Sequence, residues 1–213
     1  MIRLALTKGR IESDAIALLE GAGYECGELA AEMRGRKLFF SAGDGRLEIV
    51  LAKAADVITY IEHGVCDLGI VGGDTILDSQ RTFYEVMDLG FGKCRLALAG
   101  PAGRDFYSSL SHKIVATKYP NITKAYFNNR NVDVEIVKIE GSVELAPLLK
   151  LSDAIVDIVE TGSTLLANGL EIYETITPIS ARLIVNVASI KMKKRETDEL
   201  IDRITEELNK KQC

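Results

Sequence analysis

The sequence is poor in cysteine, histidine and proline, and it contains no tryptophan. Its cysteines lie far apart without a C-x-x-C pair, and its two histidines, His63 and His112, complete no metal-ligand spacing. We therefore expect free thiols in a reducing compartment rather than a disulfide framework or a zinc site. The four cysteines are Cys26, Cys66, Cys94 and Cys213.

Long apolar runs and an excess of positive charge are also missing. No apolar run of about 18 residues occurs, and the N-terminal stretch becomes charged at Lys8 and Arg10 before a signal-like segment develops. The 26 Lys and Arg against 31 Asp and Glu give a net charge of −5, so no global field attracts nucleic acid or an anionic membrane. We expect a cytoplasmic protein with neither of these partners, and any anionic ligand must be held by a local site.

What the sequence does contain is a regular alternation of apolar strand-like runs and helical patterns. Its 213 residues suffice for one large domain or two small lobes. Apolar strands flanked by helices indicate largely parallel sheets buried on both faces, and the alternation restarts near Lys93. The sequence therefore predicts an α/β protein with two doubly wound lobes around a cleft. Residues 1–92 plus 178–213 form the expected first lobe, and residues 93–177 form the second.

The expected elements follow from the apolar spacing. Strands are expected at 2–6, 37–41, 47–52, 67–71, 95–99, 114–116, 132–139 and 154–159. Helices are expected at 11–22, 57–64, 105–110, 122–129, 145–149, after 161 and around 200–208. The Asp44-Gly45 pair favours a tight turn, which predicts a hairpin between the second and third strands.

The most informative stretch is residues 153–165, in which a buried strand leads to carboxylates and then to Thr161-Gly162-Ser163-Thr164 at a helix start. Ligands of open α/β sheets bind beyond the carboxyl ends of strands, where a helix start offers free N–H donors to a phosphate. Asp157 adds acceptors for sugar hydroxyls, so the stretch predicts a site for a phosphorylated ribose. Alternatively, Thr161 or Ser163 only caps the helix and Asp157 is a strand-end charge. The pattern alone does not separate the two interpretations.

Other polar clusters occupy comparable strand ends. Lys8-Gly9-Arg10 follows the first strand, and it matches neither a P-loop nor a dinucleotide fingerprint. The basic cluster 34–37 precedes the hairpin, while residues 72–74 and 140–142 each follow a strand. Each cluster also has a plainer interpretation as a solvated loop or a turn. No Ser/His/Asp or Cys/His set is present, which argues against covalent acyl chemistry.

Several motifs together resemble the catalytic subunit of ATP phosphoribosyltransferase, over essentially the whole chain. The motifs are Thr7-Lys8-Gly9-Arg10, Arg36-Lys37-Leu38, Asp56-Val57 with Tyr60–Gly64, Asp67-Leu68-Gly69, Ala116–Tyr119, Gly141–Pro147, and Asp157 through Leu170. The resemblance implies a fold similar to type II periplasmic binding proteins. It also implies transfer of a phosphoribosyl group from 5-phosphoribosyl 1-pyrophosphate (PRPP) to N1 of ATP, with release of pyrophosphate, as the first step of histidine biosynthesis.

The resemblance also implies roles for particular residues. Arg10 and Arg36 are the expected catalytic residues, because they resemble the family's arginines that meet the substrate phosphates. The family uses Mg²⁺, which we expect to be held mainly by substrate phosphates, with no protein ligand. Lys53 stands where many members of the family have Arg, and it supplies charge without a bidentate fork. The implied substrate-binding residues are Lys8, Gly9, Lys53, Asp74, Glu140, Gly141, Ser142, Asp157, Thr161, Gly162, Ser163 and Thr164.

The resemblance further implies an assembly. Because the chain stops at Cys213, we expect the short form of the family, which works in a hetero-octamer with a regulatory subunit resembling histidyl-tRNA synthetase. Alone, the chain is expected to form a homodimer, to turn over slowly and to lack a histidine site of its own. Two alternatives stay open: a small-anion binding module with the same fold, and a phosphoribosyltransferase that uses another base.

Overall fold

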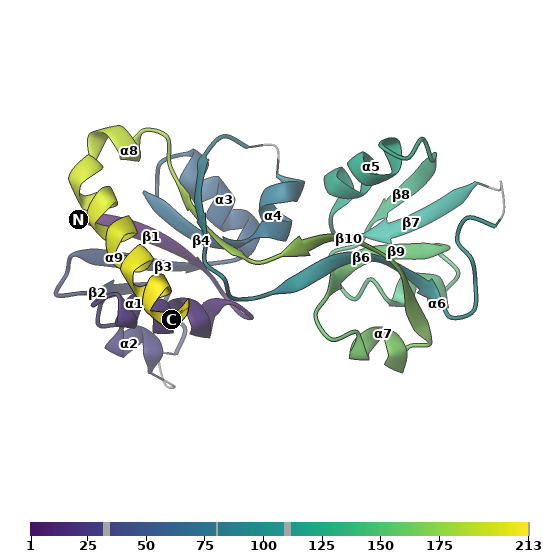
Figure 1. Cartoon of the computed structure of the whole chain (residues 1–213), viewed down its shortest axis with the longest axis horizontal. Coiled ribbons are helices and arrows are strands. Elements are labelled where there is room, and N and C mark those ends of the chain that lie inside the picture. The colour runs from purple at the N-terminus through teal and green to yellow at the C-terminus, as the bar shows by residue number, and fades with distance from the viewer. Residues whose placement is uncertain (32–34, 80, 109–111, 213) are drawn as a thin grey trace. The chain divides into compact units, whose positions relative to one another are not determined.

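The computed structural model describes residues 1–31, 35–79, 81–108 and 112–212. The chain divides into two compact units (Figure 1). The first unit comprises Met1–Ile76, Gln80–Gly92 and Ser180–Cys213, and the second comprises Leu77–Ser79 and Lys93–Ile179. Apart from the short Leu77–Ser79 segment, the chain therefore enters the second unit at Lys93 and returns to the first at Ser180. No helix among the described residues is both long and apolar enough to cross a membrane.

The first unit is built on a mixed sheet with the strand order β2-β3-β1-β4-β11-β5. The central strands β3, β1 and β4 are parallel, whereas β2 and β11 run antiparallel to their neighbours. The strands are β1 (Ile2–Thr7), β2 (Phe39–Ala42), β3 (Leu47–Ala52), β4 (Leu68–Gly72), β5 (Tyr84–Asp88) and β11 (Ala181–Val185). The expected hairpin between 37–41 and 47–52 is confirmed as β2 and β3.

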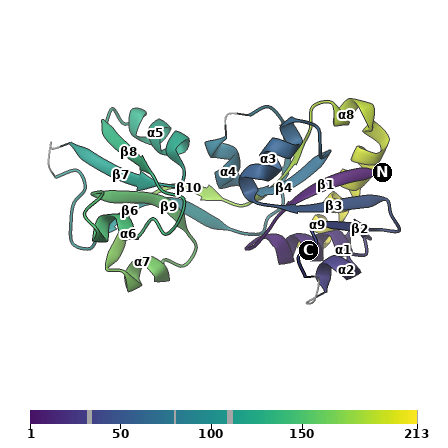
Figure 2. The ribbon, with the colours of Figure 1, turned by 180° about the vertical axis from the view of Figure 1, so that it is seen from behind.

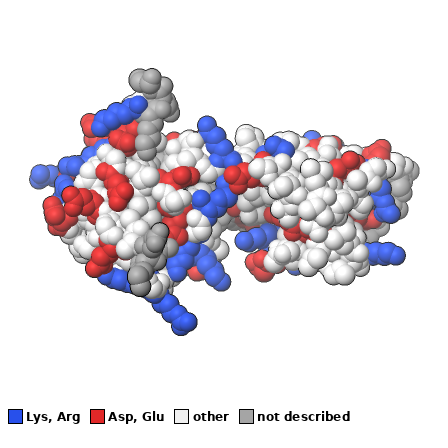
Figure 3. Space-filling model, turned by 90° about the horizontal axis from the view of Figure 1, so that it is seen from below, with Lys and Arg blue, Asp and Glu red and all other residues white. Residues whose placement is uncertain are grey.

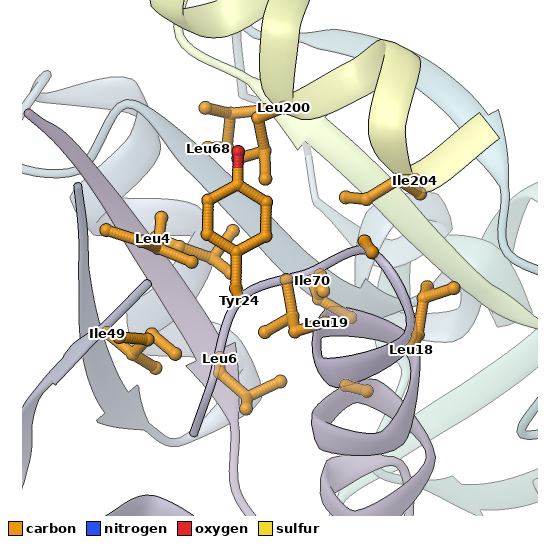
Figure 4. Close-up of a cluster of buried hydrophobic side chains, with 14 of the residues drawn as sticks. Leu4, Leu6, Leu18, Leu19, Tyr24, Ile49, Leu68, Ile70, Leu200 and Ile204 are labelled. Atoms are coloured by element: carbon orange, nitrogen blue, oxygen red, sulfur yellow. The ribbon is translucent and has the colours of Figure 1, made fainter. Parts of the chain in front are cut away.

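Helices cover both faces of this sheet (Figure 2). Helices α1 and α9 bury Leu18, Leu19, Leu200 and Ile204 in one cluster with strand residues such as Leu4 (Figure 4). Helix α3 packs Val57 and Ile61 on the other face so closely that a Cβ on Gly69 of β4 would come within 2.9 Å of Val57 Cγ1. The helices are α1 (Glu12–Gly21), α2 (Gly27–Ala30), α3 (Ala54–Glu62), α4 (Gly73–Asp78), α8 (Ser189–Met192) and α9 (Lys194–Gln212).

The second unit has a smaller mixed sheet with the order β10-β6-β9-β7-β8. Strands β9, β7 and β8 are parallel, and β6 runs antiparallel to both β9 and β10. The strands are β6 (Cys94–Pro101), β7 (Lys113–Thr117), β8 (Val134–Lys138), β9 (Ala154–Val159) and β10 (Leu170–Ile179). Helix α5 (Pro120–Asn128) covers one face, while α6 (Leu145–Leu148) and α7 (Ser163–Ala167) cover the other.

The structure corrects several details of the sequence-based expectation. The sheets are mixed rather than largely parallel, because β6, β10 and β11 run antiparallel to their neighbours. Asp105–Ser108 form turns instead of a helix, and the rest of the range expected to be helical, 109–110, lies outside the described residues. Helix α4 begins at Gly73, where only a strand end was expected, and β5 was not expected at all. Cys26, Cys66 and Cys94 are free thiols, while Cys213 lies outside the described residues.

A buried polar network ties the C-terminal helices to the start of β4. The Asp67 carboxylate, only 5% exposed, accepts hydrogen bonds from the Arg3 N–H at 2.9 Å, the Ser189 hydroxyl at 2.8 Å and the Lys193 ammonium at 2.8 Å. Burial alone would raise the pKa of Asp67, but the bonds from Lys193, the Arg3 backbone and Ser189 outweigh it and lower the pKa. The charged form is therefore the form that stabilises the fold.

Replacing this carboxylate should make the free energy of unfolding less dependent on pH in the acidic range. We expect Asp67→Asn to lower the free energy of unfolding by about 2 kcal/mol near pH 7, since it weakens charge-assisted bonds to three donors. Because the folded pKa is lowered, the wild-type contribution is present above the unfolded value of about 3.9 and is lost as pH falls through the folded pKa. Urea melts at pH 7 and pH 3 should show the difference between the two proteins shrinking. Asp198→Asn, at an exposed Lys194–Asp198 pair, should change stability by less than about 0.5 kcal/mol at both pH values.

Candidate functional site

The topology of the first unit brings several predicted site residues to one edge of its sheet. Strands β1, β3 and β4 are parallel, with Thr7 opposite Ala52 and Leu6 opposite Ile70, so their carboxyl ends lie together. The Lys8 N–H donates to the Ala52 carbonyl at 2.9 Å, which fixes the start of the β1–α1 turn beside the end of β3. The residues placed at this edge are Lys8, Gly9, Arg10, Lys53 and Asp74.

The β1–α1 turn is held in a defined conformation. Gly9 has φ +98°, a value that disfavours a side chain, and its N–H donates to the buried Glu12 carboxylate at 3.0 Å. That bond is the carboxylate half of a capping box, and the Glu12 N–H in turn donates to the Gly9 carbonyl at 3.0 Å, which closes the turn. Arg10 is exposed, and its Nη1 donates to the Gly92 carbonyl at 2.7 Å. The turn thus presents exposed cations from a backbone fixed by local hydrogen bonds.

The β2–β3 hairpin carries Arg36 to the same edge. Because β2 is antiparallel to β3, the residues before β2 lie beside the carboxyl end of β3, and the Leu51 N–H donates to the Leu38 carbonyl at 2.9 Å. Arg36 is exposed, and the neighbouring Lys37 pairs with Glu28. Arg34 of the same basic cluster lies outside the described residues.

Asp74 lies at the end of β4, where α4 begins, and it is 8% exposed. A Cβ on Gly72 would lie 2.2 Å from the Asp74 carboxylate, so this carboxylate sits directly over the glycine backbone. Gly72 therefore permits the close approach that keeps Asp74 at the strand end.

The second unit repeats the arrangement on its own sheet. Thr117 of β7 lies opposite Lys138 of β8 and Val156 of β9, so the carboxyl ends of these parallel strands share one edge. The 140–142 and 160–164 loops therefore leave the same edge of the sheet with β7 between them, and Asp157 lies two residues before the end of β9. Lys138 pairs with Glu140 at 2.7 Å, and this carboxylate raises the pKa of the Lys138 ammonium.

The 161–164 loop combines a glycine in the left-handed conformation with exposed hydroxyls. Gly162 has φ +84° and precedes the first residue of α7, a conformation that a side chain disfavours. The Thr161 and Ser163 hydroxyl oxygens lie 3.0 Å apart, and the Ser163 N–H donates to Thr161 Oγ1 at 3.3 Å. Thr161, Ser163 and Thr164 are exposed, so their polar groups are accessible to a ligand.

Positive and negative side chains are mixed over one face of the surface rather than gathered into large patches of one sign. On the face drawn in Figure 3, Lys and Arg side chains are interspersed with Asp and Glu, so this face carries no extended field of one sign. Among the residues that the structure describes, no three His, Cys, Asp or Glu side chains cluster as metal ligands. The chemistry that the two edges offer is therefore binding and electrostatic stabilisation of anions, with hydroxyls and carboxylates positioned for polar groups.

One residue of the first edge was missed from sequence. Glu12 is buried, and its carboxylate accepts a hydrogen bond from the Gly9 N–H. The spacing of three residues between Gly9 and Glu12 is the signal that could have identified it.

Comparisons with known proteins agree on one family. The family model described as HisG: ATP phosphoribosyltransferase matches residues 53–206. A Clostridium kluyveri protein named ATP phosphoribosyltransferase is 56% identical over 208 residues, covering 98% of this chain and 94% of that protein. A Clostridium acetobutylicum protein of the same name is 51% identical over 203 residues, covering 95% and 94%.

Solved structures agree with both the family and the fold. The chain is similar to one from the ATP phosphoribosyl transferase (HisG:HisZ) complex of Thermotoga maritima, with a TM-score of 0.83, 33% identity and coverage of 98% and 99%. The periplasmic VFT2 domain of Bordetella pertussis BvgS, at 12% identity, has a TM-score of 0.59 and coverage of 98% and 92%. The alkanesulfonate-binding protein SsuA of Xanthomonas axonopodis, at 11% identity, has a TM-score of 0.57 and coverage of 97% and 72%. These last two show the fold alone, and they confirm the expected likeness to periplasmic binding proteins.

The family match covers more than half of the chain, and relatives above 50% identity cover nearly all of it. The chain therefore belongs to the ATP phosphoribosyltransferase family, the transferases that catalyse the first step of histidine biosynthesis.

Proposed function

We propose that this chain carries out the transfer with two residue sets, one at each sheet edge. The observation that carries the proposal is the 161–164 loop, where an accessible Thr-Gly-Ser-Thr follows directly on β9 and its half-buried Asp157. Exposed hydroxyls and backbone N–H groups suit the 5-phosphate of PRPP, and the Asp157 carboxylate suits the ribose hydroxyls. In this proposal Glu140, Gly141 and Ser142 contact the same substrate from the loop after β8.

The residues at the edge of the first unit bind ATP and the pyrophosphate group. Lys8, Arg10, Arg36 and Lys53 supply positive charge, and Gly9 lets the backbone approach a phosphate closely. Asp74 contacts the nucleotide. Arg10 and Arg36 are the catalytic residues in this proposal, because a guanidinium offers the fork of donors that a phosphate accepts.

The reaction needs charge stabilisation more than proton transfer. The bond from N1 of adenine to C1 of the ribose forms while the bond from C1 to the pyrophosphate oxygen breaks. Positive charge develops at C1 and negative charge on the departing pyrophosphate, so positioned cations lower the barrier. The N1 lone pair is itself the nucleophile. Arg10 and Arg36 also reduce the repulsion between two polyanions that must meet for the reaction.

Mg²⁺ is part of this proposal as an ion carried mainly by the substrate phosphates. Such an ion usually binds through one or two carboxylates plus phosphates and water, and it neutralises phosphate charge. In this proposal the substrate phosphates and water supply the ligands of the ion, and the half-buried Asp157 contacts the ribose hydroxyls.

A regulatory partner is proposed on the likeness to the chain of the HisG:HisZ complex, which aligns over 99% of its length. We propose that a subunit resembling histidyl-tRNA synthetase joins this chain in a cytoplasmic hetero-octamer and carries the histidine site. An allosteric effect requires a second site with different affinity in two states, and the proposal places that site on the partner.

Pyrophosphate release from the purified chain tests the function and the regulation together. We expect release only when ATP, PRPP and Mg²⁺ are all present, a dimer by light scattering, and no inhibition by histidine in the absence of a partner. A small-anion binding module would bind PRPP without releasing pyrophosphate. Replacing ATP with free adenine, uracil or orotate separates this enzyme from a phosphoribosyltransferase for another base. Strong histidine inhibition of the lone chain would contradict the proposed regulation.

A further inference from the structure

The residues proposed to bind PRPP in the second unit lack a positive charge. Glu140 and Asp157 are carboxylates, and the other members of that set are neutral. Lys138 at the same edge is already paired with Glu140. A phosphate beside two carboxylates is repelled unless a cation offsets them, so a cationic side chain at this edge would strengthen phosphate binding.

Arg95 lies at the position where such a cation is needed. It is the second residue of β6, and in the antiparallel β6–β9 pair it stands directly opposite Val159, the last residue of β9. The chain continues from Val159 through Glu160 into the 161–164 loop. Residues directly opposite each other in such a pair have Cβ atoms about 5 Å apart. Arg95 therefore starts within one strand spacing of Val159, which lies two residues before the proposed phosphate loop.

The alternation of side chains along β6 places Arg95 on the face of the sheet that α6 and α7 cover. Its neighbours Leu96 and Leu98 belong to the cluster under α5, whereas Ala97 and Ala99 belong to the cluster under α6 and α7. Arg95 shares the parity of Ala97 and Ala99. Asp157 stands opposite Ala97 and therefore lies on that same face, as does Leu165 of α7.

The guanidinium of Arg95 has no assigned role within the fold. No hydrogen bond or ion pair joins it to any other residue that the structure describes, although Arg3, Arg46, Arg81, Arg130, Arg182 and Arg203 all have acidic partners. The side chain is half-buried, and its nitrogens are not among the buried atoms without a partner, so they keep contact with solvent. The partly buried aliphatic part of the Arg95 side chain restricts its orientation, while the N–H donors of the guanidinium stay available to a ligand.

We infer that Arg95 binds the 5-phosphate of PRPP together with the 161–164 loop. This inference rests on the proposed function, and it adds the missing cation to the PRPP set. A guanidinium matches the phosphate with two parallel N–H donors, which an ammonium cannot do. Arg95→Lys should therefore restore only part of the affinity that Arg95→Met loses.

Calorimetric titration with PRPP and Mg²⁺, and separately with ribose 5-phosphate, tests the assignment. For Arg95→Met we expect both dissociation constants to rise roughly 10- to 100-fold, the range for a lost hydrogen-bonded charge contact. In steady-state assays KM for PRPP should rise by a similar factor while KM for ATP stays unchanged. A purely structural role would change both constants together and would lower the melting temperature.

The matched control is Arg104→Met, which removes the same charge just beyond the other end of β6. Arg104 is exposed and follows Pro101, at the opposite edge of the same sheet. We expect it to bind both ligands as the wild type does. Wild-type affinity for ribose 5-phosphate in Arg95→Met would overturn the inference while leaving the proposed function intact. Failure of the wild-type chain itself to bind PRPP would count against the proposed function instead.

Discussion

Arg36→Ala should lower kcat by more than it raises KM. If Arg36 stabilises the departing pyrophosphate, the negative charge that it meets is larger in the transition state than in the bound substrate. The expected loss is about 2–4 kcal/mol of transition-state stabilisation, which corresponds to roughly 30- to 1,000-fold in kcat/KM. The structure supports this choice, because the β2–β3 hairpin carries an exposed Arg36 to the carboxyl edge of β3. Steady-state rates of pyrophosphate release, with single-turnover rates to isolate the chemical step, measure the effect.

Lys37→Ala is the matched control for this substitution. It removes the same charge one residue further along, but Lys37 pairs with Glu28 and lies 5.3 Å from the centroid of the Phe40 ring. An exposed pair of this kind contributes about 0–1 kcal/mol to stability and nothing to a reacting group. We expect kcat within about twofold of the wild type. An unchanged single-turnover rate in Arg36→Ala would remove Arg36 from the catalytic set.

Most strands could be predicted because their apolar runs are buried on both faces. The runs at 2–6, 47–52 and 154–159 became β1, β3 and β9 within a residue of the expected bounds. Strand β5 was missed because it lies at a sheet edge and none of its side chains is buried, which gives no apolar run. Helix α4 was missed because it begins with glycine directly after a strand, where a turn is the usual interpretation.

In the candidate site, the contacts that follow from strand order or from nearby residues could be predicted, and the contacts between distant strands could not. Residues 8–10, 53 and 74 share an edge because parallel strands align their carboxyl ends, a rule that sequence order alone can use. The hydrogen bond from Gly9 to Glu12 is also local, and the three-residue spacing between them could have indicated it. Arg95 could not be identified from sequence, because its neighbour Val159 is 64 residues away and belongs to an antiparallel pair that was not expected.

Gly162→Val should abolish detectable binding of PRPP while the fold still melts cooperatively. Gly162 has φ +84°, and an L-residue in this left-handed region costs about 1–2 kcal/mol, so the backbone of the loop is driven to rearrange. An added Cβ meets only ordinary contacts, 3.7 Å from Val159 Cγ1 and 4.0 Å from Ile172 Cδ1, so the core beneath the loop is not disrupted. The larger effect falls on the ligand, because the branched side chain occupies space where a phosphate approaches the backbone. Calorimetric titration with PRPP, alongside thermal melts, measures both effects.

Gly103→Val separates the loss of the phosphate site from the cost of the backbone conformation. Gly103 has φ +73° and open space around its Cβ position, and it follows β6 at the edge of the sheet opposite the 161–164 loop. The two substitutions therefore carry a similar conformational cost and should lower the melting temperature by a few degrees each. Only Gly162→Val should lose PRPP binding. Tight residual binding by Gly162→Val would place the 5-phosphate elsewhere on the second unit, whereas loss of binding in both variants would mean that backbone strain alone disables the site.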